Sequence, residues 1–213
     1  MHITKFGHCC MLIEEQGLRI LIDPGELTID KHETKKIDVI LITHEHFDHL
    51  HVPSVQKVLA DSPEARLYTI PSVGELLQRS GVAHQLLLHG DSVVENHVRI
   101  EAFGQDHAVI HPDLPLPRNT GFFIADTFFY PGDAFTDPGK RPKILALPIA
   151  GPWMKISEAI DYACKLRPEV CFPVHDGIIV DVLRTVLAGT ATKLLAPHGI
   201  RFEPIDEKGA VTF

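Results

Sequence analysis

The first fifty residues alternate between short apolar runs and turn residues, which is typical of a small antiparallel sheet. The runs HITKFG, CCMLIEE and LRILID occupy residues 2–22, and Gly17 lies where a turn is needed. The sequence DPG at residues 23–25 ends the third run with residues that favour turns. The next apolar run, VILI at residues 39–42, is uninterrupted and β-branched, as in strands buried on both faces. We therefore expect short strands over residues 2–22 and a buried strand over residues 37–42.

Farther along the chain, predicted strands meander first and then alternate with helices. The pattern predicts strands over residues 66–70, 85–89, 93–103, 121–125, 127–130, 143–149 and 169–174, and helices over residues 53–60, 72–79, 156–166 and 178–187. Residues 104–118 show no periodicity and are predicted to form a loop, and the tail 200–213 supplies two short strands. This order indicates a sheet-rich core with helices on its outer faces.

The composition is that of an ordinary globular protein. The chain has 213 residues, of which 45% are hydrophobic and 23% charged, and we expect one domain over residues 1–213. A net charge of −8 argues against a nucleic-acid partner. No apolar run approaches the ~18 residues needed to span a bilayer, and the N-terminus lacks a signal-peptide pattern. We expect a cytoplasmic protein with a small-molecule substrate and no membrane partner, and leave open whether it forms a homo-oligomer.

The cysteines give no indication of a functional site, whereas the histidines do. The four cysteines form no CxxC pair, and Cys9 and Cys10 are adjacent in an apolar run. A chain of this length does not need a disulfide framework, so we expect reduced, buried thiols. Histidine is unusually frequent, with 14 residues against 3 Met, 3 Tyr and 1 Trp. The histidines, rather than the cysteines, therefore direct the search for a functional site.

Four potential metal ligands directly follow the buried strand. The sequence HEHFDH places His44, His46, Asp48 and His49 within six residues. Imidazole and carboxylate groups are good ligands for divalent metals and poor core formers. In an extended loop His44 and His46 point to the same side and can share one ion, which leaves Asp48 and His49 for a second ion. The alternative is a surface cluster of histidines without metal, which this spacing after a buried strand disfavours.

Three further polar residues each follow an apolar run. His107 follows the run that ends at Phe103, Asp133 ends the sequence YPGD, and His175 follows CFPV. If these strands share a sheet with residues 37–42, their ends converge on one rim, where sites of α/β proteins usually lie. Any one of these residues alone would more often be structural. With the first motif they supply the seven ligands that a site for two metals requires.

These motifs together resemble the metallo-β-lactamase superfamily. HEHFDH is followed by a lone His, a glycine-preceded Asp and a C-terminal His at a strand end. Within the superfamily, GHCCMLIEE, LIDPG, YPGD, LPIAG and PVHDG resemble the branch that includes L-ascorbate-6-phosphate lactonase, over nearly the whole chain. The resemblance implies a four-layer αββα sandwich, an α/β fold (α+β in some schemes). It also implies a dinuclear metal site at one edge of the two sheets.

The resemblance further implies how two metal ions divide the ligands. The first ion would be held by His44, His46 and His107, the second by Asp48, His49 and His175, with Asp133 bridging both. Mixed nitrogen and oxygen ligation without cysteine suits zinc first, and manganese or iron as well. Two such ions sharing a water lower its pKa and leave a bridging hydroxide as nucleophile. An ester, a lactone or a phosphodiester would be its target.

Asp48 and His8 are the candidates for a catalytic role. Asp48 would lie beside the hydroxide, where it can orient the nucleophile or carry its proton. His8 belongs to the GH step of the resemblance, which implies a group that faces the rim or supports a ligand. A histidine hydrogen-bonded to the backbone is an equally good interpretation of His8.

Four other residues are candidates for supporting or substrate-facing roles. Asp23 either orients a ligand imidazole or caps a turn. His111 competes with His107 for the place of the third histidine, and we prefer His107 because it lies closer to the end of the apolar run. Trp153 either stacks on a substrate or packs at the rim. Lys155 either attracts an anionic substrate or is an exposed lysine without a role.

A hydrolase is the favoured function, with three alternatives. An iron-dependent oxygenase on the same scaffold would use one metal ion and fewer ligands. A non-catalytic metal-binding protein is disfavoured because no ligand position is replaced. An RNA-processing nuclease is disfavoured by the acidic charge balance.

Overall fold

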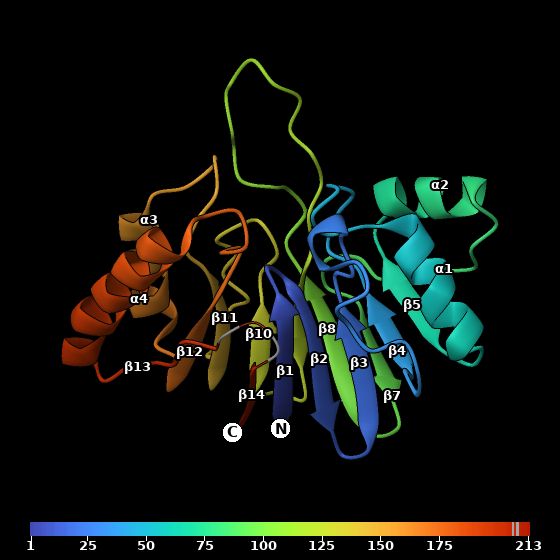
Figure 1. The fold of residues 1–213 in the computed structure, drawn as a ribbon, viewed down its shortest axis with the longest axis horizontal. Coiled ribbons are helices and arrows are strands. Elements are labelled where there is room, and N and C mark those ends of the chain that lie inside the picture. Colours follow the sequence, from blue (N-terminus) through green and yellow to red (C-terminus); the bar gives the residue numbers. More distant parts are fainter. Residues whose placement is uncertain (206, 208) are drawn as a thin grey trace.

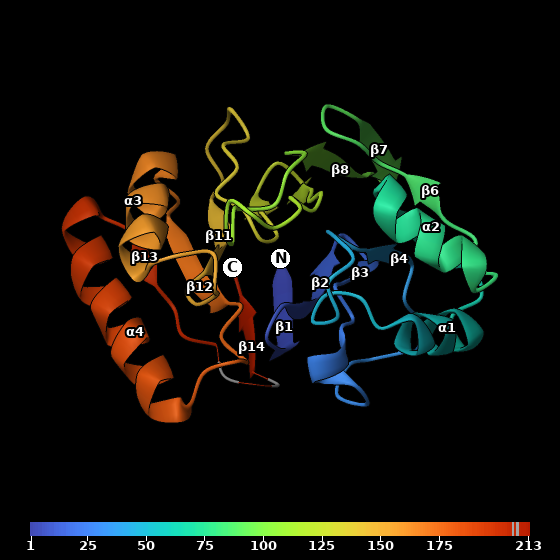
Figure 2. The same ribbon diagram turned by 90° about the horizontal axis from the view of Figure 1, so that it is seen from above.

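The computed structural model consists of two seven-stranded sheets packed face to face, with a pair of helices outside each sheet (Figure 1, Figure 2). It describes residues 1–205, 207 and 209–213. The strand order is β14-β1-β2-β3-β4-β5-β6 in the first sheet and β13-β12-β11-β10-β9-β8-β7 in the second. This is the four-layer αββα arrangement that the sequence resemblance implied. No helix within the described part of the chain is long and apolar enough to cross a membrane.

The two sheets draw their strands from both ends of the chain. The first contains β1 (His2–Gly7), β2 (Cys10–Glu15), β3 (Leu18–Ile22), β4 (Val39–Leu41), β5 (Arg66–Thr69), β6 (Gln85–Leu86) and β14 (Gly209–Thr212). The second contains β7 (Ser92–Glu95), β8 (Val98–Phe103), β9 (Gly121–Ile124), β10 (Phe128–Tyr130), β11 (Ile144–Pro148), β12 (Val170–Val174) and β13 (Arg201–Phe202). The helices are α1 (Val52–Asp61), α2 (Pro71–Arg79), α3 (Ile156–Leu166) and α4 (Asp181–Leu195), with 3-10 turns η1 (Glu26–Thr28) and η2 (Ala196–His198).

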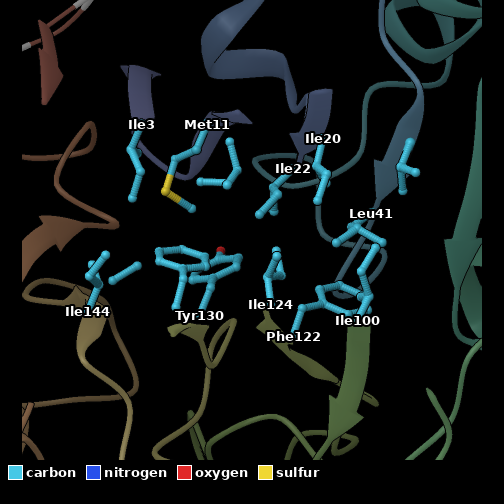
Figure 3. Packing of buried hydrophobic residues seen from close by; sticks show 14 of the residues in the cluster. Ile3, Met11, Ile20, Ile22, Leu41, Ile100, Phe122, Ile124, Tyr130 and Ile144 are labelled. Carbon is cyan, nitrogen blue, oxygen red and sulfur yellow. The ribbon is translucent and has the colours of Figure 1, made fainter. Parts of the chain in front are cut away.

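Apolar side chains fill three layers between these elements. Between the sheets, the labelled residues of Figure 3 are Ile3, Met11, Ile20, Ile22 and Leu41 on one side and Ile100, Phe122, Ile124, Tyr130 and Ile144 on the other. Alternate residues of the same strands point outwards, so Ile40 packs with Val55 of α1 and Leu145 packs with Ala163 of α3. Because the central strands are covered on both faces, their sequences are continuous apolar runs.

Most predicted elements are confirmed, but residues 93–103 do not form one strand. They belong to a hairpin in which β7 pairs with β8. The turn is Asn96-His97, with φ values of 43° and 68°, and asparagine and histidine tolerate this left-handed region better than most residues. Sequence reasoning missed the turn because it contains neither glycine nor proline.

The last helix and the tail also differ from the prediction. Helix α4 begins at Asp181, not at residue 178, and continues to Leu195. Several of its apolar side chains are exposed, so periodicity marked neither end. The predicted strand over 85–89 is reduced to the two residues of β6. The tail contains β13 and β14 as predicted, and within it Asp206 and Lys208 lie outside the described residues. The four cysteines are free thiols, of which Cys164 is half-buried and the other three are buried.

Strand direction determines where the polar loops gather. β1, β3 and β4 run the same way, because β2 is antiparallel to both neighbours and β3 is parallel to β4. β8, β10 and β12 also share one direction, since β9 is antiparallel to β8 and β10 and the chain continues in parallel through β11. The carboxyl ends of parallel strands meet at one edge of a sheet. The segments after these six strands contain His8, Asp23, residues 44–49, His107, Asp133 and His175.

Candidate metal centre

The structure brings the seven predicted ligands together in two adjacent groups. The ligand atoms of His44, His46, His107 and Asp133 lie within 4.8 Å of one another, as do those of His8, Asp48, His49 and His175. All these side chains are buried except His46, which is half-buried. Apart from the addition of His8, the two groups divide the residues as the resemblance implied.

Asp133 lies between the two groups. Its Oδ2 atom is 3.3 Å from Nε2 of His107 and 2.9 Å from Nε2 of His175. Its Oδ1 atom is 3.2 Å from Nε2 of His49. A single carboxylate therefore reaches histidines of both groups, which is the geometry required of a bridging ligand.

The atoms at the centre of the site are suited to bind cations. Among the described residues, Nε2 of His49, His107 and His175 and Oδ1 of Asp133 are buried without a hydrogen-bond partner. Each such atom costs about 1–3 kcal/mol unless something binds it. Imidazole nitrogen and carboxylate oxygen are the donors that zinc and related divalent ions prefer. The residues present therefore fit divalent metal ions.

Burial and neighbouring charges make some histidines of the site neutral and others cationic. Burial, followed by the nearby His49, holds the pKa of His44 well below its usual value. Burial would also lower the pKa of His175, but Asp133 outweighs this effect and raises it to about 10. Burial opposes ionisation of Asp133, yet His49 and His175 hold the pKa of this carboxyl well below its usual range. Asp133 is therefore ionised and negatively charged.

Asp23 holds the imidazole of His49 from behind. Nδ1 of His49 lies 2.8 Å from Oδ2 of Asp23, which is fully buried. The same carboxylate accepts hydrogen bonds from the amide and hydroxyl of Thr43 and from the hydroxyl of Tyr130, each at 2.8 Å. A proton on Nδ1 leaves Nε2 of His49 free to bind a metal. Thr43 and Tyr130 were not anticipated, and Tyr130 is 107 positions away from Asp23, so no local pattern reveals it.

The structure places His107, and not His111, in a ligand group. The His107 side chain is fully buried, and its Nδ1 donates to the carbonyl oxygen of Ala108 at 2.6 Å, which leaves Nε2 facing Asp133. The His111 side chain is 62% exposed and belongs to neither ligand group. Its ring contacts the backbone and carboxylate of Asp113 instead.

His8 is buried behind Asp48 and does not line the cleft described below. The backbone N–H of Gly177 donates to its Nδ1 at 3.1 Å, so the ring proton is on Nε2. Nε2 then donates to Oδ2 of Asp48 at 2.9 Å. The side chain of His8 is only 1% exposed, which excludes the substrate-facing position considered from the sequence.

Contacts between β1 and the end of β12 join the two sheets beneath the site. The amide of His175 donates to the carbonyl oxygen of His8 at 3.3 Å. Three residues before His8 and one residue after His175, the buried pair Lys5–Asp176 is 2.6 Å apart. A buried ion pair tolerates little misalignment, because loss of one partner leaves a desolvated charge. These contacts therefore fix His175 relative to His8.

The backbone around the ligands has an unusual conformation. His8, Asp23 and His175 have φ values of 46°, 45° and 60°, in the left-handed region that side chains rarely adopt. Strained residues of this kind cluster at functional sites. Gly25 is required for a different reason, since a Cβ atom there would lie 2.0 Å from the carbonyl oxygen of Asp48. Each of these features occurs at a predicted ligand or at a residue that contacts one.

A cleft of about 340 Å³ opens onto the ligands. Trp153 lines it, is 8% exposed and donates from Nε1 to Oδ2 of Asp133 at 3.1 Å. The indole thus contacts the bridging carboxylate as well as the rim. Lys155 is exposed and is not among the residues that line the cleft.

Cys9 is a neighbour of the site that the sequence analysis treated only as a buried thiol. Its sulfur lies within 4.8 Å of ligand atoms of His49 and Asp133. Burial alone would raise its pKa, but the neighbouring His8 and His49 lower it to about 6. The only signal in the sequence was its position directly after His8.

Comparison with known proteins identifies the family. Residues 2–175 match the family described as "Beta-lactamase superfamily domain". The chain is 35% identical to Protein Rv0786c of Mycobacterium tuberculosis over 100% of both chains. It is 31% identical to UPF0173 protein PF0020 of Pyrococcus furiosus, over 83% of this chain and 84% of the relative. The chain therefore belongs to the metallo-β-lactamase superfamily and, within it, to the UPF0173 family of metal-dependent hydrolases.

Solved structures support the fold. Igni18, a metallo hydrolase from Ignicoccus hospitalis, superposes with a TM-score of 0.78 at 23% identity, covering 100% of this chain and 97% of Igni18.

Further UPF0173 relatives, 25% to 29% identical, carry the description metal-dependent hydrolase. These matches support the superfamily and the UPF0173 family, and give no support to the narrower lactonase branch suggested by the motifs.

Proposed function

We propose that this protein is a hydrolase that holds two divalent metal ions, zinc before manganese or iron, and acts on an ester, a lactone or a phosphodiester. The observation that carries the proposal is the position of Asp133. Its carboxylate is 2.9 Å from Nε2 of His175, 3.2 Å from Nε2 of His49 and 3.3 Å from Nε2 of His107. Among the described residues, these three nitrogen atoms are buried and have no hydrogen-bond partner. The description of UPF0173 relatives as metal-dependent hydrolases supports the same class of activity.

The ligands divide between the two ions as the two groups suggest. His44, His46 and His107 would hold one ion, Asp48, His49 and His175 the other, and Asp133 both. When bound, the ions would supply a water of lowered pKa as the nucleophile and offset negative charge on the reacting oxygen. The buried ligands and Trp153 would keep bulk water away from one side of the reacting centre.

Asp48 is the proposed catalytic residue. Burial would raise its pKa, but the neighbouring imidazoles of His175 and His8 hold the pKa of this carboxyl far below its usual range. The group therefore stays ionised and accepts hydrogen bonds, which suits it to orient an attacking water. His8 is proposed to position Asp48 through the 2.9 Å hydrogen bond from Nε2, without contact to the substrate.

The proposal is tested by metal content and turnover of one preparation. Protein purified without chelator should hold about two divalent ions per chain by elemental analysis, and should hydrolyse at least one member of a panel of p-nitrophenyl esters, lactones and phosphodiesters. The Asp48→Ala variant should lose nearly all turnover. Asp113→Ala is the control, because the Asp113 side chain is 91% exposed and belongs to neither ligand group.

Each part of the proposal has its own contrary result. Less than about one metal ion per chain would remove the dinuclear centre. One iron ion per chain with oxygen uptake would indicate an oxygenase instead of a hydrolase. Turnover of Asp48→Ala within a few-fold of wild type would reject the role of Asp48. Selective hydrolysis of a lactone would support the resemblance to the lactonase branch, which is otherwise only proposed.

A further inference from the structure

The wall of the metal cleft is apolar although it faces solvent. Phe47, Ile110 and Ile178 line the cleft and remain 57%, 39% and 47% exposed. Pro152 and Trp153 complete the apolar side of the cleft. Large apolar side chains left open to water around a concave site indicate binding of an apolar ligand.

These three side chains are tied to the metal ligands by short stretches of chain. Phe47 lies between His46 and Asp48, Ile110 is three residues after His107, and Ile178 is three residues after His175. These ligand residues are buried, apart from the half-buried His46, so the apolar positions three residues away or closer have little freedom to move relative to them. An apolar group bound on this wall would therefore have a defined position relative to the reacting centre.

The described residues that line the cleft provide no permanently charged cationic side chain. Among the described residues that line it, none is Lys or Arg. Arg118, Arg184 and Lys155 do not line the cleft either, and the two arginines pair with Asp106 at 2.6 Å and with Asp181 at 2.9 Å. Sites for phosphate groups usually provide Arg or Lys for the nonbridging oxygens. A phosphodiester would here depend on the metal ions alone.

We propose that the substrate is an uncharged carboxylic ester or lactone whose acyl chain packs against Phe47, Ile110 and Ile178. This inference rests on the hydrolase function proposed above. In the reaction, the oxygen of water bonds to the acyl carbon and the carbon–oxygen bond to the alcohol breaks. The acyl part leaves as a carboxylate with release of one proton, and the departing alkoxide takes up a proton to become the alcohol. No oxidant or other co-reactant is needed.

The first test compares leaving-group-matched substrates. p-Nitrophenyl acetate, butyrate and octanoate share one leaving group with bis(p-nitrophenyl) phosphate and differ in the part that must bind the wall. With the metal-loaded protein, kcat/KM should rise roughly fourfold for each methylene until the cleft is filled. The phosphodiester should be the poorest of the four substrates. A phosphodiester preferred over every ester would overturn the inference while leaving the metal-dependent hydrolase in place.

Matched variants test whether the wall causes the preference. Ile110→Ser and Ile178→Ser remove apolar surface from partly exposed positions and should each lower the octanoate-to-acetate ratio of kcat/KM by about three- to tenfold. Val94→Ser is the control, because Val94 is 65% exposed in β7 and does not line the cleft. An unchanged ratio in both cleft variants would overturn the inference.

A binding measurement separates the inference from turnover. Alkyl hydroxamates of two to eight carbons carry one metal-binding group on chains of increasing length, and their affinity for the zinc-loaded protein is measured by calorimetry. Affinity should increase with chain length in wild type and in Val94→Ser, and much less in Ile178→Ser. If affinity rises in this way but no ester or phosphodiester is hydrolysed, the apolar site stands and the proposed hydrolase function fails. If affinity is independent of chain length, the apolar site fails.

Discussion

The carboxylate of Asp23 lies 2.8 Å from Nδ1 of His49 and accepts a hydrogen bond from this ring nitrogen at the base of the metal centre. Thr43 donates twice and Tyr130 once to the same carboxylate, so with His49 it accepts four hydrogen bonds. This arrangement holds the orientation and the tautomer of His49 and leaves Nε2 directed at Asp133.

Asp23→Asn is expected to weaken metal binding without changing any ligand. The amide nitrogen brings a donor where Asp23 accepts hydrogen bonds, so at least one neighbouring donor loses its partner at a cost of about 1–3 kcal/mol. Loss of the hydrogen-bond partner behind a metal-binding histidine typically lowers metal affinity 10- to 100-fold. Competition with a chromophoric chelator measures the affinity. Asp113→Asn, at an exposed position, should match wild type, and equal affinities for all three proteins would show that His49 needs no support.

Gly25→Ala should destabilise the ligand loop although the backbone angles suit alanine. Gly25 has φ −83° and ψ 176°, but its Cβ would lie 2.0 Å from the carbonyl oxygen of Asp48 and 2.6 Å from the amide nitrogen of His49. Since both contacts are backbone atoms of the loop, the loop must move. We expect a loss of about 1–3 kcal/mol in the free energy of unfolding and weaker metal binding.

Gly189→Ala provides the opposite control. Gly189 lies in α4 with nothing within 4 Å of the added Cβ, so alanine should raise the free energy of unfolding by up to about 1 kcal/mol. Urea denaturation with tryptophan fluorescence measures both variants. A stable Gly25→Ala protein with normal metal content would contradict the close approach of these two segments.

His107→Ala and His111→Ala should behave differently. His107 is fully buried and faces Asp133 at 3.3 Å, whereas the His111 side chain is 62% exposed. We expect His107→Ala to lose about one metal ion per chain and nearly all turnover, and His111→Ala to keep its metal content. Elemental analysis together with circular dichroism separates metal loss from unfolding. The reverse result would assign the third histidine ligand to His111.

Metal binding should release protons and strengthen as pH rises. In the absence of metal, Asp133 raises the pKa of His175 to about 10 against the effect of burial, so this histidine is protonated at pH 7. The pKa of His49 is also raised, again against burial and chiefly by Asp133. Only neutral imidazole binds metal, so an incoming ion must displace these protons, and affinity must increase with pH.

The number of protons can be measured directly. Titration of zinc into metal-free protein at pH 7 in two buffers of different ionisation enthalpy should show release of roughly one to two protons per chain. His175→Ala should release fewer protons. Release that is absent, or affinity that falls between pH 6 and pH 8, would contradict this charge distribution.

Local sequence was sufficient for most of the fold. The strands over residues 2–22, the buried strand before the first ligands and the helix Ile156–Leu166 follow from apolar spacing, because each buries a regular face. The turn at Asn96-His97 could not be predicted, since its positive φ values occur without glycine. The length of α4 was also missed, because its exposed valines break the apolar stripe.

By itself, the sequence determined the chemistry of the ligands: HEHFDH and three later polar residues at strand ends indicate imidazole and carboxylate donors for metal ions. The tertiary structure alone decided how these donors are arranged. Strands from both sheets bring His8, Asp133 and His175 to within hydrogen-bonding distance of Asp48 or of one another. The pair Lys5–Asp176, which joins the two sheets beside these donors, spans 171 positions. Side-chain orientation, tautomer and the apolar cleft wall depend on long-range packing, which no local pattern encodes.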